Sequence, residues 1–215
     1  MKYLVKTLTF AGALIAVTSC NKREIIPAPE PVVELKNHFY GKFNSSEVEL
    51  TQNVNGYVGS SDLDLIVNSN TLDSAIYIST MSSTSANQLV KISHGSLLFD
   101  WGTSERPTLA SFESFFKAAP NLQPSFSIRG LNGFSFTYFD AAGKEWKSNE
   151  THAYLDENVT YLSTSKESDT SGDYMKFKVE FEAYIYHTYF HLIDSVYYTD
   201  SMLVTDAVYT GWYKR

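Results

Sequence analysis

The chain has little cysteine, proline, glycine or basic charge, and each shortage removes a class of protein. A single cysteine in 215 residues excludes an intramolecular disulfide framework, a cysteine-based zinc site and a Cys-x-x-Cys redox motif. Six prolines and eleven glycines are too few for a collagen-like or low-complexity chain. With 17 basic against 24 acidic side chains, the net charge of −7 argues against a nucleic-acid partner, because phosphate binding is built from clustered lysine and arginine.

Aromatic side chains are plentiful. The 14 Phe, 15 Tyr and 3 Trp, in a chain that is 43% hydrophobic, exclude intrinsic disorder. The length is suited to one domain, which at this size buries roughly 70% of the surface of its unfolded chain.

The apolar run near the N-terminus is short. It extends from Leu8 to Val17, follows Lys2 and Lys6, and leads into Thr18-Ser19-Cys20. A membrane-spanning helix needs about 20 apolar residues, so this run does not cross a bilayer. A basic start, a short apolar stretch and small residues at its end are typical of a secretory signal peptide, which is excluded from the fold.

The end of this segment, Val17-Thr18-Ser19-Cys20, resembles the lipobox of bacterial lipoproteins. The resemblance implies lipidation of Cys20, removal of residues 1–19 and a mature chain with three acyl chains. Two or more acyl chains hold a protein on a membrane stably, whereas one does not. Asn21 follows the cysteine in place of the Asp that retains many lipoproteins in the inner membrane of enteric bacteria, so we expect an outer-membrane protein, facing either leaflet. The alternative is an ordinary secretory signal that ends in a cysteine by chance.

Three of the six prolines are Pro27, Pro29 and Pro31. Alternating prolines favour an extended, semi-rigid spacer. We therefore divide the chain into a signal peptide (1–19), a lipidated cysteine with a proline-rich spacer (20–36) and a single β domain (37–215).

Most of the domain alternates between apolar and polar residues. The alternation is clear in residues 39–43, 62–67 and 134–138. It is longest in residues 177–185, where apolar residues alternate with Lys178, Glu180 and Glu182; the apolar residues are Phe177, Val179, Phe181, Ala183 and Ile185. This period of two predicts antiparallel strands with one face in a shared core. We predict an all-β fold, an antiparallel β-sandwich with one short helix, and keep a lipocalin-like β-barrel as the alternative.

Turn residues separate the predicted strands. Residues 53–56, 94–96 and 140–143 have the composition of hairpin loops, and the last resembles a type I turn with Gly143 in the left-handed position. Residues 203–212 are interpreted as a final hairpin. The helix is predicted over 108–118, where apolar residues recur at three- and four-residue spacing behind Thr108, a suitable N-cap. We expect its aromatic side chains to belong to the core.

The lipobox, the aromatic-rich strands and the hairpin at 140–143 together resemble uncharacterised outer-membrane lipoproteins of Bacteroidota-type envelopes. This family resemblance implies an envelope location and gives no functional residue that could be carried over.

Local motifs for chemistry are missing from the sequence. It contains no Gly-x-Ser-x-Gly, no phosphate-binding glycine loop, no Gly-x-Gly-x-x-Gly and no His-Glu-x-x-His. We therefore assign no catalytic residue, no metal site and no cofactor. A dispersed pair of carboxylates leaves no local motif, so a hydrolase acting on an envelope or extracellular polymer stays the alternative function.

Three groups of polar residues are candidates for metal ligands, and none has the spacing of a metal site. His187 and His191 lie in a sequence typical of a strand, where four residues separate the two rings by roughly 13 Å, too far to share one zinc. Asp62 and Asp64 fit the solvated face of a strand. The acidic residues of 165–173 (Glu167, Asp169 and Asp173) lack the order of a calcium loop and fit a flexible surface loop better.

The surplus of aromatic residues in the last third is the one feature that favours a function. Tyr184 and Tyr186 fall on the polar side of the strand that contains Glu180 and Glu182. Exposed aromatic rings on a sheet stack on sugars or anchor a protein interface, although a covering layer would make them part of the core. We expect a non-catalytic binding module that is held on the membrane by Cys20 and binds a glycan or a protein of the envelope through Tyr184 and Tyr186.

Overall fold

The computed structural model describes residues 30–67, 72–119, 124–127, 132–148 and 158–215. By its internal contacts the chain separates into two units, Met1–Pro31 and Val32–Arg215. Cys20, the signal peptide and most of the spacer lie outside the described residues, so their predictions stay untested. The second unit contains the whole β structure and is described by itself.

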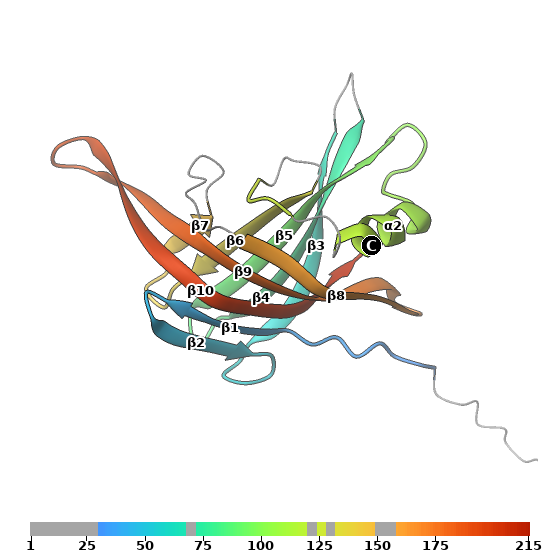
Figure 1. Cartoon of the computed structure of the whole chain (residues 1–215), viewed down its shortest axis with the longest axis horizontal. Helices are drawn as coiled ribbons and strands as arrows, with labels where there is room; N and C mark the ends of the chain where they lie inside the picture. Colours follow the sequence, from blue (N-terminus) through green and yellow to red (C-terminus); the bar gives the residue numbers. More distant parts are fainter. Residues whose placement is uncertain (1–29, 68–71, 120–123, 128–131, 149–157) are drawn as a thin grey trace, which may run out of the picture. The chain divides into compact units, whose positions relative to one another are not determined.

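Ten strands and one helix are described in this unit (Figure 1). The strands are β1 (His38–Phe43), β2 (Ser46–Thr51), β3 (Val58–Ile66), β4 (Asp73–Ser83), β5 (Gln88–Phe99), β6 (Gly133–Phe139), β7 (Glu145–Ser148), β8 (Asn158–Asp169), β9 (Gly172–His191) and β10 (Val196–Lys214). The helix is α2 (Leu109–Ala118). The all-β prediction with one short helix is therefore confirmed.

All ten strands belong to one antiparallel sheet in the order β2-β1-β10-β9-β7-β6-β5-β4-β3, with β8 also paired to β9. The sheet curls into a half-barrel, so that its opposite walls face each other across the core, as the two sheets of a sandwich would (Figure 1). The end of β10 returns to β3, where the Lys214 amide donates to Ser61 Oγ at 2.9 Å. This arrangement is compatible with the barrel alternative.

The longest predicted alternation lies in β9. Phe177, Val179, Phe181, Ala183 and Ile185 are buried, and the residues between them face outward. Because side chains of a strand point alternately to its two faces, this one strand supplies a continuous line of core residues. The prediction for this segment is confirmed.

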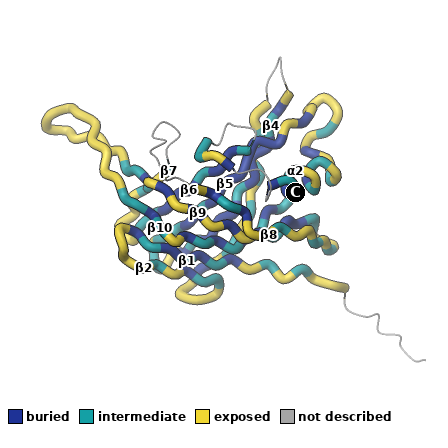
Figure 2. The backbone as a smooth tube through the Cα atoms, viewed as in Figure 1, coloured by how far each residue is buried: buried dark blue, intermediate teal, exposed yellow. Residues whose placement is uncertain are grey.

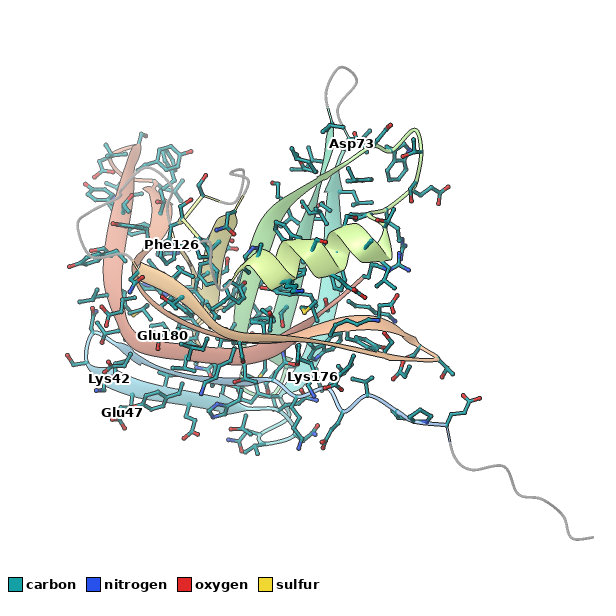
Figure 3. The ribbon with its side chains drawn as sticks, turned by 45° about the vertical axis from the view of Figure 1, so that its right-hand side comes forward. Lys42, Glu47, Asp73, Phe126, Lys176 and Glu180 are labelled. Carbon is teal, nitrogen blue, oxygen red and sulfur yellow. The ribbon has the colours of Figure 1, made fainter. Side chains whose placement is uncertain are left out.

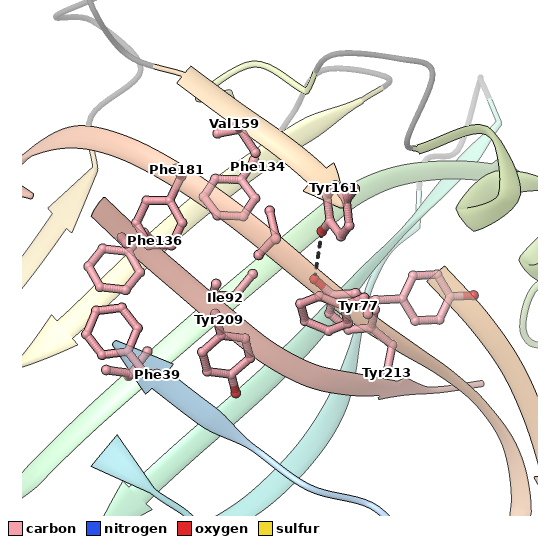
Figure 4. Packing of buried hydrophobic residues seen from close by; sticks show 14 of the residues in the cluster. Phe39, Tyr77, Ile92, Phe134, Phe136, Val159, Tyr161, Phe181, Tyr209 and Tyr213 are labelled. Carbon is pink, nitrogen blue, oxygen red and sulfur yellow. Dashed lines mark hydrogen bonds between the residues drawn. The ribbon is translucent and has the colours of Figure 1, made fainter. Parts of the chain in front are cut away.

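Aromatic rings from distant strands fill the space that the sheet encloses (Figure 4). Phe181 of β9 packs against Phe136 of β6 with ring centroids 4.8 Å apart, and Phe136 stacks on Phe39 of β1 at 5.7 Å. At the other end of the core, Phe177 stacks on Tyr213 at 4.3 Å. Contacts between aromatic rings at such distances add to the stability that their buried area provides.

Helix α2 covers this second end of the core. Thr108 caps it by accepting a hydrogen bond from the Ser111 amide, as the sequence predicts. Phe112 and Phe116 are fully buried and contact Tyr77 with ring centroids at 5.0 and 5.2 Å. The aromatic stripe of the helix is therefore core, which confirms that prediction.

A few polar groups are buried among these rings. His94 Nδ1 lies 2.6 Å from the hydroxyl of Tyr161, which in turn lies 3.0 Å from the hydroxyl of Tyr213. Full burial lowers the pKa of His94 to about 3, because the charged ring would lose its hydration. Burial likewise raises the pKa of Tyr209, the partner of Asn37 and Ser79, to about 12.

Two of the predicted turns have the expected chemistry. Residues 53–56 connect β2 to β3, with Asn53, Asn55 and Gly56 at positive φ. In the turn between β6 and β7, Asp140 accepts hydrogen bonds from the amides of Ala142 and Lys144, and Gly143 has a φ of 77°.

Three local predictions are wrong. His94, Gly95 and Ser96 lie inside β5 and are not a hairpin loop, because the core supplies a hydroxyl partner for His94. Residues 203–212 belong to the single strand β10, since the hairpin before it turns between His191 and Val196. Residues 165–173 form the end of β8 and a tight turn into β9 in place of a flexible loop, because the Asp169 carboxylate accepts hydrogen bonds from Ser171 and Gly172.

Candidate binding surface

Strands β9 and β10 continue beyond the rest of the sheet as a two-stranded hairpin, residues 187–203, which we call the arm (Figure 1). Their pairing runs without interruption from Val196 opposite His191 to Val204 opposite Ala183. The neighbouring strands end earlier: β7 pairs with β9 only as far as Tyr186, and β1 pairs with β10 only as far as Val204. At the base of the arm, Leu203 also bonds to Asn44 in the turn between β1 and β2. Beyond Leu203 the arm is, among the described residues, a ribbon of two strands.

A β-bulge lies at the base of the arm. Thr205 and Asp206 of β10 stand opposite the single residue Glu182 of β9, and Asp206 has a φ of 51°. A bulge bends a strand and increases its local twist. This bend accompanies the departure of the arm from the curled sheet.

The arm exposes apolar side chains, and Figure 2 shows its outer part as an unbroken run of exposed residues, 188–201. At the tip Ile193 is 90% exposed and Leu192 is 83% exposed, and on the second strand Tyr197 is 72% exposed. Other exposed apolar or aromatic residues of the arm are Tyr189, Phe190, Val196 and Tyr198. Isolated exposed hydrophobic residues are ordinary, but a contiguous group of this kind marks an interaction site.

Tyr184 and Tyr186, the two predicted binding residues, lie at the base of the arm. Tyr184 is exposed, whereas Tyr186 is half-buried and opposite Lys147 of β7. By the alternation of β9 they share a face with Phe190, whose ring lies 5.0 Å from that of Tyr197. The structure thus places the two predicted tyrosines on one face with two more exposed rings, Phe190 and Tyr197, further out along the arm.

The opposite face of the arm has its own line of rings. Trp146 of β7 contacts His187 at 5.5 Å, His187 stacks on Tyr189 at 5.6 Å, and Tyr189 stacks on Tyr198 at 5.9 Å. His187 Nδ1 also lies 2.9 Å from the Glu145 carbonyl oxygen. These contacts connect the arm to the sheet and give its two strands a common packed side.

Asp194 organises the turn at the tip. Its carboxylate accepts hydrogen bonds from the Tyr198 hydroxyl at 2.6 Å and the Val196 amide at 3.3 Å, and lies 3.0 Å from His191 Nδ1. The hydrogen bond from Tyr198 is the main reason that the pKa of Asp194 is lowered. The polar groups of the tip are thus used within the turn, while Leu192 and Ile193 face solvent.

The arm and the entry of the chain into the β unit are at opposite ends of β9. The Val33 amide donates to Asp169 Oδ2 at 2.9 Å, in the turn that precedes β9, and β9 then runs 20 residues to His191. Figure 1 shows the segment that leads into β1 at one end of the sheet and the arm at the other.

An acidic hollow of about 480 Å³ lies beside the bulge, on the outer side of the sheet. Its carboxylates are Glu180, Glu182 and Asp206, and Asp206 forms an ion pair of 2.8 Å with Lys42. Lys42 and Glu180 are labelled in Figure 3. The exposed carboxylates border an open surface, with Phe181 and Ala207 among the lining residues.

The candidate metal ligands of the sequence analysis have other partners or face solvent. His187 and His191 are in extended backbone and bond to different groups, as above, and Asp62 and Asp64 are exposed on β3. Glu167 pairs with Lys176, and Asp173 accepts from Ser168 and Arg215. Within the described ranges, no three His, Cys, Asp or Glu side chains are grouped to hold a metal ion.

The described part of the chain contains no helix that is long and apolar enough to cross a membrane. Comparison with protein-family models, with curated proteins and with solved structures finds no match. The arm was missed by sequence reasoning as an element, although the aromatic excess of residues 184–198 is its signal.

Proposed function

We propose that this protein is a lipid-anchored, non-catalytic binding protein of the bacterial cell envelope, and that its arm binds a protein partner. The supporting observation is the projecting hairpin with exposed apolar side chains on its tip and both strands. A two-stranded hairpin is marginally stable by itself in water, so an arm of this length is suited to being covered by another surface.

A protein partner fits the arm better than a glycan. Sugar binding combines an aromatic platform with free hydrogen-bonding groups beside it. At the tip, His191 and Tyr198 both bond to the Asp194 carboxylate. The most exposed residues there are the aliphatic Leu192 and Ile193. Aliphatic and aromatic groups together are typical of protein interfaces.

The proposed spacer leaves the arm accessible. If Cys20 is acylated, the residues from Cys20 to Val33 span at most about 40 Å as a polyproline II spacer. The arm lies at the far end of β9 from Val33, so the proposed spacer enters the β unit at a distance from the arm. The outer membrane is the proposed location, because Asn21 follows Cys20 in place of an inner-membrane retention Asp.

The anchor is tested by Cys20→Ser. The variant is expected to move from the membrane fraction to the soluble fraction, because the acyl chains are the proposed attachment. A variant that remains in the membrane pellet to the same extent as the wild type would contradict the anchor.

The binding surface is tested by capture of envelope proteins on the purified protein. Leu192→Ser with Ile193→Ser removes the apolar tip, and the matched control, Val54→Ser with Val58→Ser, removes exposed apolar groups far from the arm. We expect a defined partner to be lost at least about tenfold with the tip variant and retained with the control. Tyr184→Ala with Tyr186→Ala tests the base of the arm in the same assay, and a glycan array tests the other ligand class. Equal capture by the tip variant and the control would refute the role of the arm.

A hydrolase with dispersed carboxylates is the second candidate, because of the acidic hollow. Glu180 and Glu182 are two residues apart on one strand face, which places them about 7 Å from each other, a separation found in inverting glycosidases. Glu180 and Glu182 are exposed and project from the same strand, so they do not face each other across a cleft. This arrangement favours a binding function over hydrolysis. Glu180→Gln would abolish any hydrolysis of envelope polysaccharide that depends on this pair.

A further inference from the structure

The edge of β10 within the arm differs from the edges at the two ends of the sheet. The sheet ends at β2 and β3, and β8 pairs with β9 alone. Charged residues line these edges, Glu47 and Glu49 on β2 and Asp62 and Asp64 on β3. Charges on an edge strand prevent it from pairing with another chain.

The segment of β10 from Val196 to Met202 has little such protection. Its sequence, Val-Tyr-Tyr-Thr-Asp-Ser-Met, contains one charged residue, no lysine and no proline. Its strand pairing with β9 is regular, without a bulge. Within the described residues, no strand pairs with its other side, because β1 stops at Val204. Such an edge is a template for strand addition.

We propose that this edge pairs with the same edge of a second copy, which gives a twofold-symmetric dimer with a four-stranded sheet formed by the two arms. Self-pairing of one antiparallel edge closes after two copies, so it does not continue into a fibre. The four-stranded product also removes the weakness of an isolated two-stranded ribbon. The proposal goes beyond the proposed function and does not depend on it.

The charge pattern fits a register centred on Thr199. In that register Thr199 faces Thr199 of the second copy, and Tyr198 faces Asp200 of the second copy. Like charges directly opposite each other are destabilising across strands, and here the single acidic residue meets a hydroxyl-bearing ring instead. Threonine pairs and aromatic groups in such positions are favourable.

Side chains beside the seam add contacts to the pairing of the two backbones. Val196, Tyr197 and Tyr198 of each copy are exposed. In the proposed register they lie next to residues of the second copy's strand, on the two faces of the joined sheet. Cross-strand contacts of aromatic and β-branched side chains stabilise a strand pair.

The first test measures the oligomeric state of the full chain in a Cys20→Ser background, by light scattering over a concentration series. Thr199→Lys places two positive charges opposite each other in the proposed register, and the dimer dissociation constant is expected to rise about tenfold or more. Thr188→Lys is the matched control. Thr188 lies opposite Thr199 across the hairpin, with the two hydroxyls 3.1 Å apart, so both variants lose the same contact. Only Thr199→Lys places its charge on the strand that forms the proposed dimer. The control is expected to remain dimeric.

The second test uses the absence of other cysteines. In the same background Thr199→Cys introduces the only thiol, and directly opposite residues of an antiparallel pair have Cα atoms about 4.5–5.5 Å apart, within disulfide range. Oxidation is expected to give a covalent dimer in high yield for Thr199→Cys and little for Thr188→Cys. A monomeric parent chain at every concentration, equal weakening by both lysine variants, or equal cross-linking by both cysteine variants would each overturn the proposal. The dimer and the binding of a protein partner are tested separately: a Thr199→Lys variant that is monomeric but still captures the partner would show that partner binding does not require the dimer.

Discussion

Acid is expected to destabilise the β unit through the buried His94. The folded state keeps this ring neutral, since its pKa is lowered to about 3 from an ordinary value of 6.5. In the unfolded chain the ring takes up a proton as the pH falls through 6.5, so the unfolded state binds more protons and stability decreases. The stability is full above pH 6.5 and is lost progressively as the pH falls from there toward 3.

The size of this effect follows from the shift. Each unit of pH below 6.5 costs about 1.4 kcal/mol while the folded ring stays neutral, which amounts to about 2 kcal/mol at pH 5. A loss of that size is a large fraction of the 5–15 kcal/mol that stabilises a typical domain. The window between pH 6.5 and 5 also lies above the usual titration range of carboxylates.

Urea unfolding at several pH values in this window measures the slope directly. His94→Gln retains hydrogen-bonding capacity toward Tyr161 and removes the titrating ring, so its free energy of unfolding is expected to change much less between pH 7 and 5. Phe181→Ala is the control, because it lowers stability but leaves His94 in place. A wild-type stability that is flat across the window, or a His94→Gln variant with the wild-type slope, would refute the reasoning.

Two further predictions concern the core and the tether. Phe181→Ala is expected to lower the free energy of unfolding by about 3–5 kcal/mol in urea titrations, because the ring is buried between Phe134 and Phe136; a loss below about 1 kcal/mol would show that the site collapses or is not core. Asp169→Ala removes the acceptor of the Val33 amide hydrogen bond and is expected to speed hydrogen exchange at that amide. The amides of β9 that pair with β10 are expected to stay protected. Unchanged exchange at Val33 would contradict the role of Asp169. Because Ser171 and Val33 lower the pKa of Asp169 to about 2, the wild-type Val33 contact is expected to persist at pH 4 and to be lost as the pH approaches 2.

Local chemistry determined much of the fold. The alternation of Phe177 to Ile185 predicts one face of β9 because a strand places successive side chains on opposite sides. Thr108 and the aromatic spacing behind it predict α2, and Asp140 with Gly143 predicts a turn, since each pattern satisfies backbone groups within a few residues. The burial of His94 could not be predicted from local patterns, because its hydroxyl partner Tyr161 is 67 residues away.

The arm and the closure of the sheet were decided by tertiary structure. Tyr184, Phe190 and Tyr197 belong to the same aromatic, β-branched pattern that elsewhere forms core, and the pattern does not state whether a neighbouring strand will cover it. Coverage depends on where β7 and β1 stop, at Tyr186 and Val204, which is a matter of long-range register. The pairing of β1 with β10 joins segments at opposite ends of the chain, and neither segment contains a signal for the other. Short-range patterns fix what a segment prefers to be, whereas the contacts between distant segments fix which of its faces and edges remain open.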